Sequence, residues 1–372
     1  MMKTKIGLYV HIPFCVKKCN YCDFCSFSEL DQNTREKYID KLCLEIDSYK
    51  AKNLEIDTIF FGGGTPTTLT SEEFGHIVDH IKRSFIIDDN VEFTVEANPG
   101  TTNKEKMEKF IECGVNRFSI GLQSIHEKEL KKLGRIHGFD DFVRTFNDLR
   151  NLGINNINVD LMYGIPYQTL ESFEKTLDTV LNFNPEHLSV YGLILEEGTP
   201  FYFERNSLSV PSVDIECDMY FLTAKKLAEN GYVHYEISNY SKPSRESIHN
   251  MKYWTCNEYI GVGVSAHSCF EGKRYANTSD ITEYIKSPVH VDSSKKLDVD
   301  SLKYEYAMLA LRLKKGFSLE EYNTIFSENF IYGREELINK LVSFGYMEFN
   351  DDNISLTEKG FYVSNSILTE LL

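Results

Sequence analysis

Short apolar segments alternate with amphipathic segments over the first half of the chain. Residues at helical spacing separate the apolar runs, and continuous apolar strands that alternate with helices are typical of a parallel sheet of βα units. The runs predict strands at Ile6–Ile12, Asp57–Phe61, Val91–Ala97, Arg117–Gly121, Asn156–Tyr163 and His187–Leu193. The amphipathic segments predict helices at Thr34–Lys52, Ser71–Phe85, Asn103–Cys113, Phe139–Leu152 and Thr169–Asn182. The pattern therefore predicts an α/β fold, a partial (β/α)6 barrel.

The alternation lapses near residue 200. A helix is predicted at Ser212–Asn230, and the Gly-, Ser-, Asn- and Tyr-rich stretch from Tyr232 to Tyr284 predicts a folded cap with irregular backbone. The polar segment Lys286–Val299 is the best linker candidate. We therefore expect three parts: a barrel (1–200), a cap or extension (201–290) and a C-terminal domain (301–372).

The C-terminal domain is predicted to be helical and winged-helix-like. Helices are expected at Ser301–Lys315, Ser318–Phe326 and Arg334–Phe344, followed by a hairpin over Met347–Leu356 and a closing helix. Such a shape can bind DNA, but residues 301–372 hold seven Lys and Arg against eleven Asp and Glu. Because phosphate contact needs a basic face, a structural role is favoured.

Composition narrows the classes of function. The 372 residues are 42% hydrophobic and 26% charged, as in an ordinary globular protein, and the net charge of −16 argues against nucleic-acid partners. No apolar run approaches the roughly 18 to 20 residues of a membrane-spanning helix. The apolar start is too short for a signal-peptide core. Nine cysteines, four of them clustered, fit a reducing compartment. We expect a cytoplasmic location and leave peripheral membrane association open.

Three cysteines directly follow the first predicted strand. Cys15, Cys19 and Cys22 form a C-x3-C-x2-C pattern, so their thiolates can converge on one inorganic centre. A cubane iron–sulfur cluster normally takes four thiolates, and three leave one iron open to another ligand. The alternative is a structural zinc site, with Cys25 or His11 as the fourth ligand. The spacing favours the cluster.

Further polar and glycine residues follow the next strands. Gly62-Gly63-Gly64-Thr65-Pro66 exposes its backbone after the second strand, and glycines allow close approach of a ligand. Barrels place their chemistry on the loops after the carboxyl ends of their strands. Glu96, Gln123, Arg135 and Asp160 are the polar candidates in or near such positions.

These motifs together resemble the radical S-adenosylmethionine (SAM) enzymes. The resemblance implies that Cys15, Cys19 and Cys22 hold a [4Fe–4S] cluster whose open iron binds SAM. It extends to the oxygen-independent coproporphyrinogen oxidase and heme-chaperone family through VEANP, SIGLQS, LGRIH and VDLMYGIP. The SAM-contacting positions that it implies are Tyr9, Tyr21, Gly63, Gly64, Thr65, Glu96, Gln123, Arg135 and Asp160.

Within that family the chain resembles the HemW-type heme chaperones. The decarboxylating members have a fourth cysteine where this chain has Phe24, and a long arm where only fourteen residues precede Cys15. The segment His249-Asn-Met-Lys-Tyr-Trp254 matches an HNxxYW motif associated with heme handling. His249 is therefore the candidate heme ligand; the alternative is a hydrogen-bonding residue that holds Tyr253 and Trp254. Cys25 is not assigned to the cluster, and a structural role is expected for His267.

The resemblance implies a protein that binds heme beside a SAM-liganded cluster and delivers it to apo-hemoproteins, with respiratory cytochromes as one candidate class. Two alternatives stay open: radical decarboxylation of coproporphyrinogen III, and radical modification of heme itself. Whether the chain is an enzyme is left undecided. An electron donor is expected as a further partner, nucleic acid is not, and a homodimer is left open.

Overall fold

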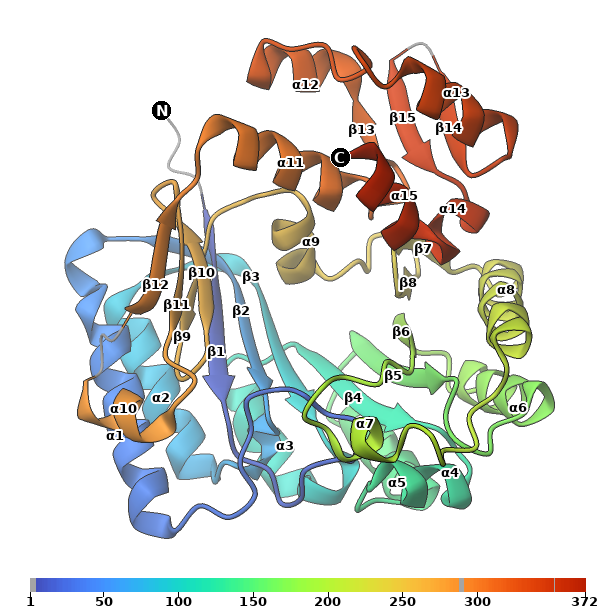
Figure 1. Ribbon diagram of the computed structural model, residues 1–372. Helices are drawn as coiled ribbons and strands as arrows, with labels where there is room; N and C mark the ends of the chain where they lie inside the picture. The colour runs from blue at the N-terminus through green and yellow to red at the C-terminus, as the bar shows by residue number, and fades with distance from the viewer. Residues whose placement is uncertain (1–4, 288–290, 351) are drawn as a thin grey trace.

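The computed structural model describes residues 5–287, 291–350 and 352–372. Its main body is a twelve-stranded sheet with the strand order β12-β11-β10-β9-β1-β2-β3-β4-β5-β6-β8-β7. Strands β9 and β1 to β6 run parallel, and the sheet curves into a partial barrel (Figure 1). The six predicted strands are confirmed, as β1 (Ile6–Ile12), β2 (Glu55–Gly63), β3 (Ile86–Ala97), β4 (Arg117–Gln123), β5 (Ile157–Tyr163) and β6 (His187–Gly192).

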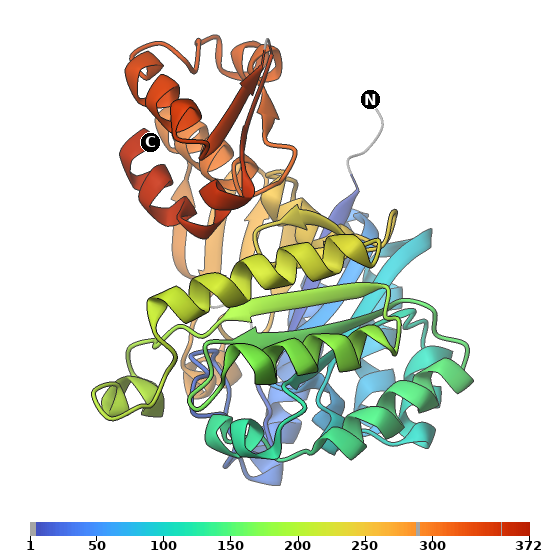
Figure 2. The same cartoon turned by 90° about the vertical axis from the view of Figure 1, so that its right-hand side faces the viewer.

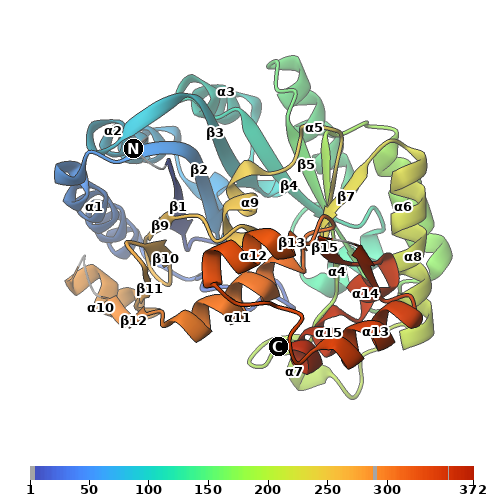
Figure 3. The ribbon, with the colours of Figure 1, turned by 90° about the horizontal axis from the view of Figure 1, so that it is seen from above.

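Helices form an arc around the outer face of the sheet (Figure 3). The five predicted helices are confirmed, as α1 (Gln32–Ser48), α2 (Ser71–Ser84), α3 (Lys104–Glu112), α5 (Phe139–Asn151) and α6 (Leu170–Leu181). A reciprocal cap between Thr70 and Glu73 explains where α2 begins, because it satisfies two backbone N–H groups of the first turn. Between β1 and β6, one short α-helix, α4 (Glu127–Leu133), was not predicted.

Side-chain alternation along the strands separates the core from the interior of the barrel. In β5, the buried residues Val159 and Leu161 belong to the main hydrophobic cluster, whereas Asn158 and Asp160 line a cavity. Successive side chains of a strand point to opposite faces, so apolar residues meet the helices and polar residues face the inside. This alternation gives the barrel its polar interior.

The stretch from Tyr232 to Tyr284 is not an irregular cap, and this expectation was wrong. Its short strands extend the sheet at both edges: β7 and β8 continue from β6, while β9 pairs in parallel with β1. The elements here are α7 (Pro200–Glu204), α8 (Val213–Glu229), β7 (Val233–Glu236), β8 (Asn239–Ser241), α9 (Ile248–Trp254), β9 (Tyr259–Val262), β10 (His267–Phe270), β11 (Lys273–Asn277) and α10 (Ile281–Lys286). The linker candidate contributes β12 (Val291–Lys296), and its residues 288–290 lie outside the described residues.

The C-terminal domain has the predicted helices and hairpin, and residue 351 of the hairpin lies outside the described residues. It stands on the end of the barrel where β1 begins (Figures 1 and 2). The loop after β1 that carries Cys15, Cys19 and Cys22, which we call the cysteine loop, lies at the opposite end. Its elements are α11 (Val299–Ala310), β13 (Phe317–Ser318), α12 (Leu319–Phe326), α13 (Glu335–Ser343), β14 (Met347–Asn350), β15 (Asn353–Leu356), α14 (Glu358–Tyr362) and α15 (Ser364–Leu371). None of the described helices has the length and apolar character needed to cross a bilayer.

Candidate functional site

The cysteine loop is anchored at its base and at its tip. At the base, the Cys15 N–H donates to the Phe27 carbonyl at 3.0 Å, and the Phe27 N–H donates to Pro13 at 2.7 Å. At the tip, the Asn20 backbone N–H donates to the Leu133 carbonyl at 2.9 Å, and its amide side chain donates to Lys132 at 2.8 Å. Backbone and side-chain hydrogen bonds therefore fix the path of the loop between β1 and α4.

Most of the predicted site residues line one cavity, which we call the thiol cavity. All of the candidates except Tyr9 and His249 are on its wall: Cys15, Cys19, Tyr21, Cys22, Gly63, Gly64, Thr65, Glu96, Gln123, Arg135 and Asp160. They come from the loops or ends of β1 to β4, from the turn after α4 and, for Asp160, from the middle of β5. The carboxyl ends of parallel strands meet at one edge, which explains why residues so distant in sequence converge.

The glycine loop lies against the start of the cysteine loop. The Gly64 N–H donates to the Ile12 carbonyl at 2.8 Å, and the Thr65 N–H donates to the Phe14 carbonyl at 2.7 Å. A Cβ at Gly63 would lie 2.4 Å from the ring of His11, and this residue has a φ of +104°. Both facts require glycine, because a side chain would clash and the backbone conformation would be strained.

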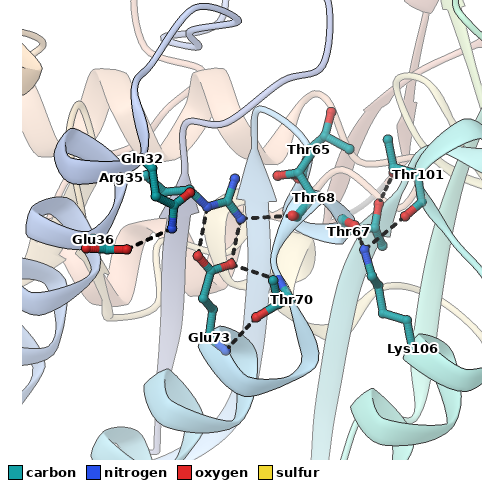
Figure 4. A network of polar contacts seen from close by, with 10 residues as sticks. All are labelled: Gln32, Arg35, Glu36, Thr65, Thr67, Thr68, Thr70, Glu73, Thr101 and Lys106. Atoms are coloured by element: carbon teal, nitrogen blue, oxygen red, sulfur yellow. Dashed lines mark hydrogen bonds and ion pairs between the residues drawn. The ribbon is translucent and has the colours of Figure 1, made fainter.

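A network of polar contacts holds the segment after the glycine loop (Figure 4). Arg35 of α1 donates to the Thr68 carbonyl at 2.8 Å and to both carboxylate oxygens of Glu73. From the other side, the Lys106 ammonium donates to the Thr67 carbonyl at 2.8 Å. These contacts fix the short helix η2 (Pro66–Thr68) and therefore the position of Thr65, whose hydroxyl lies 3.6 Å from the Cys15 sulfur.

Gln123 and Arg135 are placed by special backbone features. Gln123 has a φ of +71°, and the pairing of β4 with β5 shifts register between Gly121 and Gln123. Strained residues of this kind cluster at functional sites. The Arg135 guanidinium donates to the Gly121 carbonyl at 2.6 Å and lies 3.6 Å from the Cys19 sulfur. Its Nε is buried without a hydrogen-bond partner among the described residues, so it can still serve a ligand.

Two carboxyl groups in the thiol cavity have altered acidity. Burial, with Asp160 nearby, raises the pKa of Glu96 to about 8. Burial also raises the pKa of Asp160, against the hydrogen bond that it accepts from Asn158 at 2.7 Å. Glu96 accepts a hydrogen bond from the Gly63 N–H at 3.2 Å. A cationic ligand in this cavity would favour the charged forms of both groups.

A second space, which we call the barrel cavity, adjoins the thiol cavity. Its volume is about 450 Å³, and it shares Tyr21, Cys22, Glu96 and Asp160 with the thiol cavity. Tyr9 and His249, the two other predicted residues, lie on its wall. Arg117, which the sequence analysis missed, also lines it and is buried, with its Nε unpartnered among the described residues. A guanidinium in such a place suits a carboxylate ligand.

His249 is not available as a metal ligand in this conformation. Its Nδ1 lies 2.8 Å from the Thr58 hydroxyl, and its Nε2 lies 2.7 Å from the Tyr253 hydroxyl. The imidazole is buried, and burial together with Lys252 and Arg117 lowers its pKa to about 3, so it is neutral. In this conformation the His249 ring holds the Tyr253 hydroxyl, the contact that the alternative role requires. Iron ligation requires that the Tyr253 hydroxyl first leave Nε2.

His11 and Cys25 position the cysteine loop from outside the thiol cavity. The ring of His11, which burial leaves with a pKa of about 4, lies 2.8 Å from the Cys25 carbonyl and 3.0 Å from the Tyr9 hydroxyl. The Cys25 sulfur lies 3.5 Å from the Ser279 carbonyl. Neither residue lines the thiol cavity. Neither is placed as a fourth ligand.

The donor set fits an iron–sulfur cluster better than one zinc ion. Zinc–thiolate bonds of about 2.3 Å in a tetrahedron bring sulfurs within about 4 Å of one another. Among the residues that the structure describes, Cys15, Cys19 and Cys22 do not form a group whose ligand atoms all lie within 4.8 Å. Three thiolates without a fourth protein ligand leave an open metal position. Arg135 beside Cys19 would compensate the negative charge of a thiolate.

Comparison with known proteins agrees with this chemistry. The radical SAM superfamily profile matches residues 9–180. The heme chaperone HemW of Lactococcus lactis subsp. lactis is 34% identical over 100% of this chain and 98% of its own length. That of Bacillus subtilis is 34% identical over 98% of each. The solved coproporphyrinogen III oxidase (HemN) from Escherichia coli, a radical SAM enzyme, has a TM-score of 0.89 and 22% identity over 99% of this chain and 90% of its own, a likeness of fold.

Proposed function

The chain belongs to the HemW family of radical SAM proteins, and we propose that it is a heme chaperone that binds heme and delivers it to apo-hemoproteins. Membership of this family implies a [4Fe–4S] cluster and SAM. When bound, such a cluster supplies one electron to SAM. We assign the cluster to Cys15, Cys19 and Cys22, and the SAM site to the residues that share the thiol cavity with them. Tyr9 approaches that site from the barrel cavity.

The observation that chiefly supports the proposal is the contact between the two cavities. A ligand in the barrel cavity would share walls with the cluster and SAM, because Tyr21, Cys22, Glu96 and Asp160 line both spaces. A volume of about 450 Å³ lies within the range of small-molecule sites. We therefore propose that heme is taken up here.

Protein groups in the barrel cavity match the two chemistries of heme. The Arg117 guanidinium would pair with a propionate, since guanidinium and carboxylate form strong charge-assisted hydrogen bonds. His249 would supply an axial imidazole once Tyr253 has moved, and a neutral imidazole is a usual ligand of heme iron. The recipients we propose are apo-hemoproteins, among which respiratory cytochromes are the first to test.

The test uses the full chain with its cluster reconstituted without oxygen. Hemin is titrated into it, and the loaded protein is mixed with an apo-b-type cytochrome while the spectrum of the acceptor is followed. A parallel sample receives SAM, a reductant and coproporphyrinogen III, and mass spectrometry looks for the loss of two carboxyl groups. We expect heme transfer and no decarboxylation.

Decarboxylated product from the intact protein would overturn the chaperone assignment and identify a coproporphyrinogen oxidase. Failure of the reconstituted protein to bind hemin would overturn it as well. The matched pair of variants is His249→Ala and His267→Ala, because His267 is an exposed imidazole of the neighbouring strand β10. Only His249→Ala should weaken heme binding.

A further inference from the structure

A second group of metal-binding side chains lies in the outer helical layer, away from both cavities. Cys43 is on α1, and His76 and His80 are on α2. Each offers one ligand atom, and these three atoms all lie within 4.8 Å of one another. None of the three lines the thiol cavity or the barrel cavity. The proposed heme function does not use them.

Helical spacing explains how the group assembles. His76 and His80 are four residues apart on α2, and Cys43 and Asp47 are four residues apart on α1. Residues at this spacing lie on the same face of a helix. The two helices pack side by side. The two imidazole rings meet edge to face, with centroids 4.9 Å apart.

One histidine is held by a carboxylate. His80 Nδ1 lies 2.9 Å from Asp47 Oδ1, and the hydroxyl of buried Ser84 donates to the same oxygen at 3.0 Å. Metal-bound histidines usually give their second ring nitrogen to a carboxylate, which fixes the tautomer and the ring orientation. With Nδ1 directed to Asp47, Nε2 is the nitrogen of His80 that can bind a metal.

The three ligands differ in burial, from the buried Cys43 to the exposed His76. Cys43 is buried, His80 is half-buried and His76 is exposed, so an ion could enter from solvent beside His76 and end against the sulfur. Tetrahedral zinc needs ligand atoms about 3.5 Å apart, and the exposed His76 side chain can turn to close the remaining distance. A water molecule would complete four ligands.

We propose that Cys43, His76 and His80 form a binding site for a borderline-soft divalent metal of the zinc type, with Asp47 as the residue that orients His80. One thiolate and two imidazoles select such ions over magnesium or calcium, which prefer oxygen ligands. The Cys43 thiol loses its proton to solvent on binding. Because the site bridges α1 and α2, an occupied site ties together the helices that follow the cysteine loop and the glycine loop.

Cobalt(II) is the probe, because its visible bands report tetrahedral thiolate coordination. It is titrated without oxygen into the full chain with the cluster already reconstituted, so that Cys15, Cys19 and Cys22 are occupied. We expect one tetrahedral Co²⁺ per chain, displaced by Zn²⁺. His76→Ala should weaken binding at least about tenfold, and Asp47→Asn about 10- to 100-fold.

Cys43→Ser should remove the thiolate contribution to the spectrum, and Cys113→Ser, a partly buried cysteine at the end of α3, is its matched control. His76 is exposed, so His76→Ala tests the site even if Cys43→Ser does not fold. No tetrahedral signal in the wild-type protein would overturn the proposal. A signal unchanged by His76→Ala, or one that disappears only in variants of the three cluster cysteines, would do the same.

Discussion

The thiol cavity and the α9 end of the barrel cavity differ in whether their polar side chains have hydrogen-bond partners. In the thiol cavity, Arg135 has a buried nitrogen without a partner in the described part of the chain, and Glu96 has a raised pKa. At the α9 end, both nitrogens of His249 are bonded, and the Lys252 ammonium lies 2.8 Å from Asp57. A buried polar group without a partner costs free energy, so a ligand that pairs with Arg135 would stabilise the first region, whereas the two nitrogens of His249 already pair with protein groups.

The same difference predicts that binding of the cluster and SAM requires less rearrangement of the protein than ligation of heme iron by His249. The cluster and SAM would enter a region whose groups still lack partners. Heme iron would have to compete with an existing hydrogen bond between His249 and Tyr253. We therefore expect replacement of Cys15, Cys19 or Cys22 to abolish cofactor binding, and changes at the α9 end to alter heme binding in a graded manner.

The largest effect is expected for Cys19→Ser. It removes one of three ligands, so the iron and sulfide contents and the cluster absorbance should fall to background, and SAM binding with them. Cys25→Ser is the control, because that sulfur is turned toward Ser279. Equal loss of iron in Cys25→Ser would show that the fourth cysteine is a ligand and that the loop rearranges around the cluster.

An intermediate effect is expected from the acidity of Glu96. Its pKa of about 8 means that the carboxyl group is mostly neutral at pH 7 and becomes ionised as the pH rises through 8. If the ionised form binds the SAM amino group, the ratio of wild-type to Glu96→Gln affinity for SAM should rise about tenfold between about pH 7 and about pH 8.5. Isothermal titration at several pH values measures this rise.

The Glu96→Gln variant separates the titration of Glu96 from the titration of SAM in that experiment. Titration of SAM itself persists in the variant, so the difference between the two pH profiles reports Glu96. We expect the variant to bind SAM more weakly than the wild-type protein at high pH, and the difference to be smaller at pH 7. Identical profiles would show that Glu96 does not contact the charged part of SAM.

The smallest effect is expected for Tyr253→Phe, and it sharpens the comparison most. The change removes the hydroxyl that lies 2.7 Å from His249 Nε2 and leaves the ring in place. A neutral hydrogen bond contributes about 1 kcal/mol, so a His249 that binds heme iron should do so about fivefold more tightly in the variant. Hemin titration, followed by the Soret band, measures it. Unchanged or weaker binding would make His249 a positioning residue only.

The parallel strands could be predicted because each is a continuous apolar run of ordinary length. The short strands β7 to β11 could not, because three to five residues of mixed polarity carry no periodic signal. Their pairing depends on partners far along the chain, as when β9 pairs with β1. The missed helix α4, with the sequence EKELKKL, is short and strongly charged, so its buried Leu130 and Leu133 stand out only after folding.

For the site as well, local sequence patterns could be found, whereas contacts between residues distant in sequence could not. Cysteine spacing and the glycine triplet are local signals, so they could be found in the sequence. The contribution of Arg117 depends on what it faces across the barrel, and nothing near it in sequence marks it. His11 could be singled out because it lies close to Cys15, but its contacts with Tyr9 and Cys25 could not be predicted. His249 shows an intermediate case. Its motif and its partner Tyr253, four residues away on the same helix, could be found in the sequence, but its other partner, Thr58 of β2, could not.

The pairing of β1 with β9 also orders events on the ribosome. Strand β1, which leads into the cysteine loop, emerges first, but one of its two neighbours is residues Tyr259–Val262. Domains fold as units during synthesis, and here the nascent chain presents an open edge of β1 until most of the protein has left the exit tunnel. The strand that leads into the cysteine loop therefore has both of its neighbours only after β9 has docked.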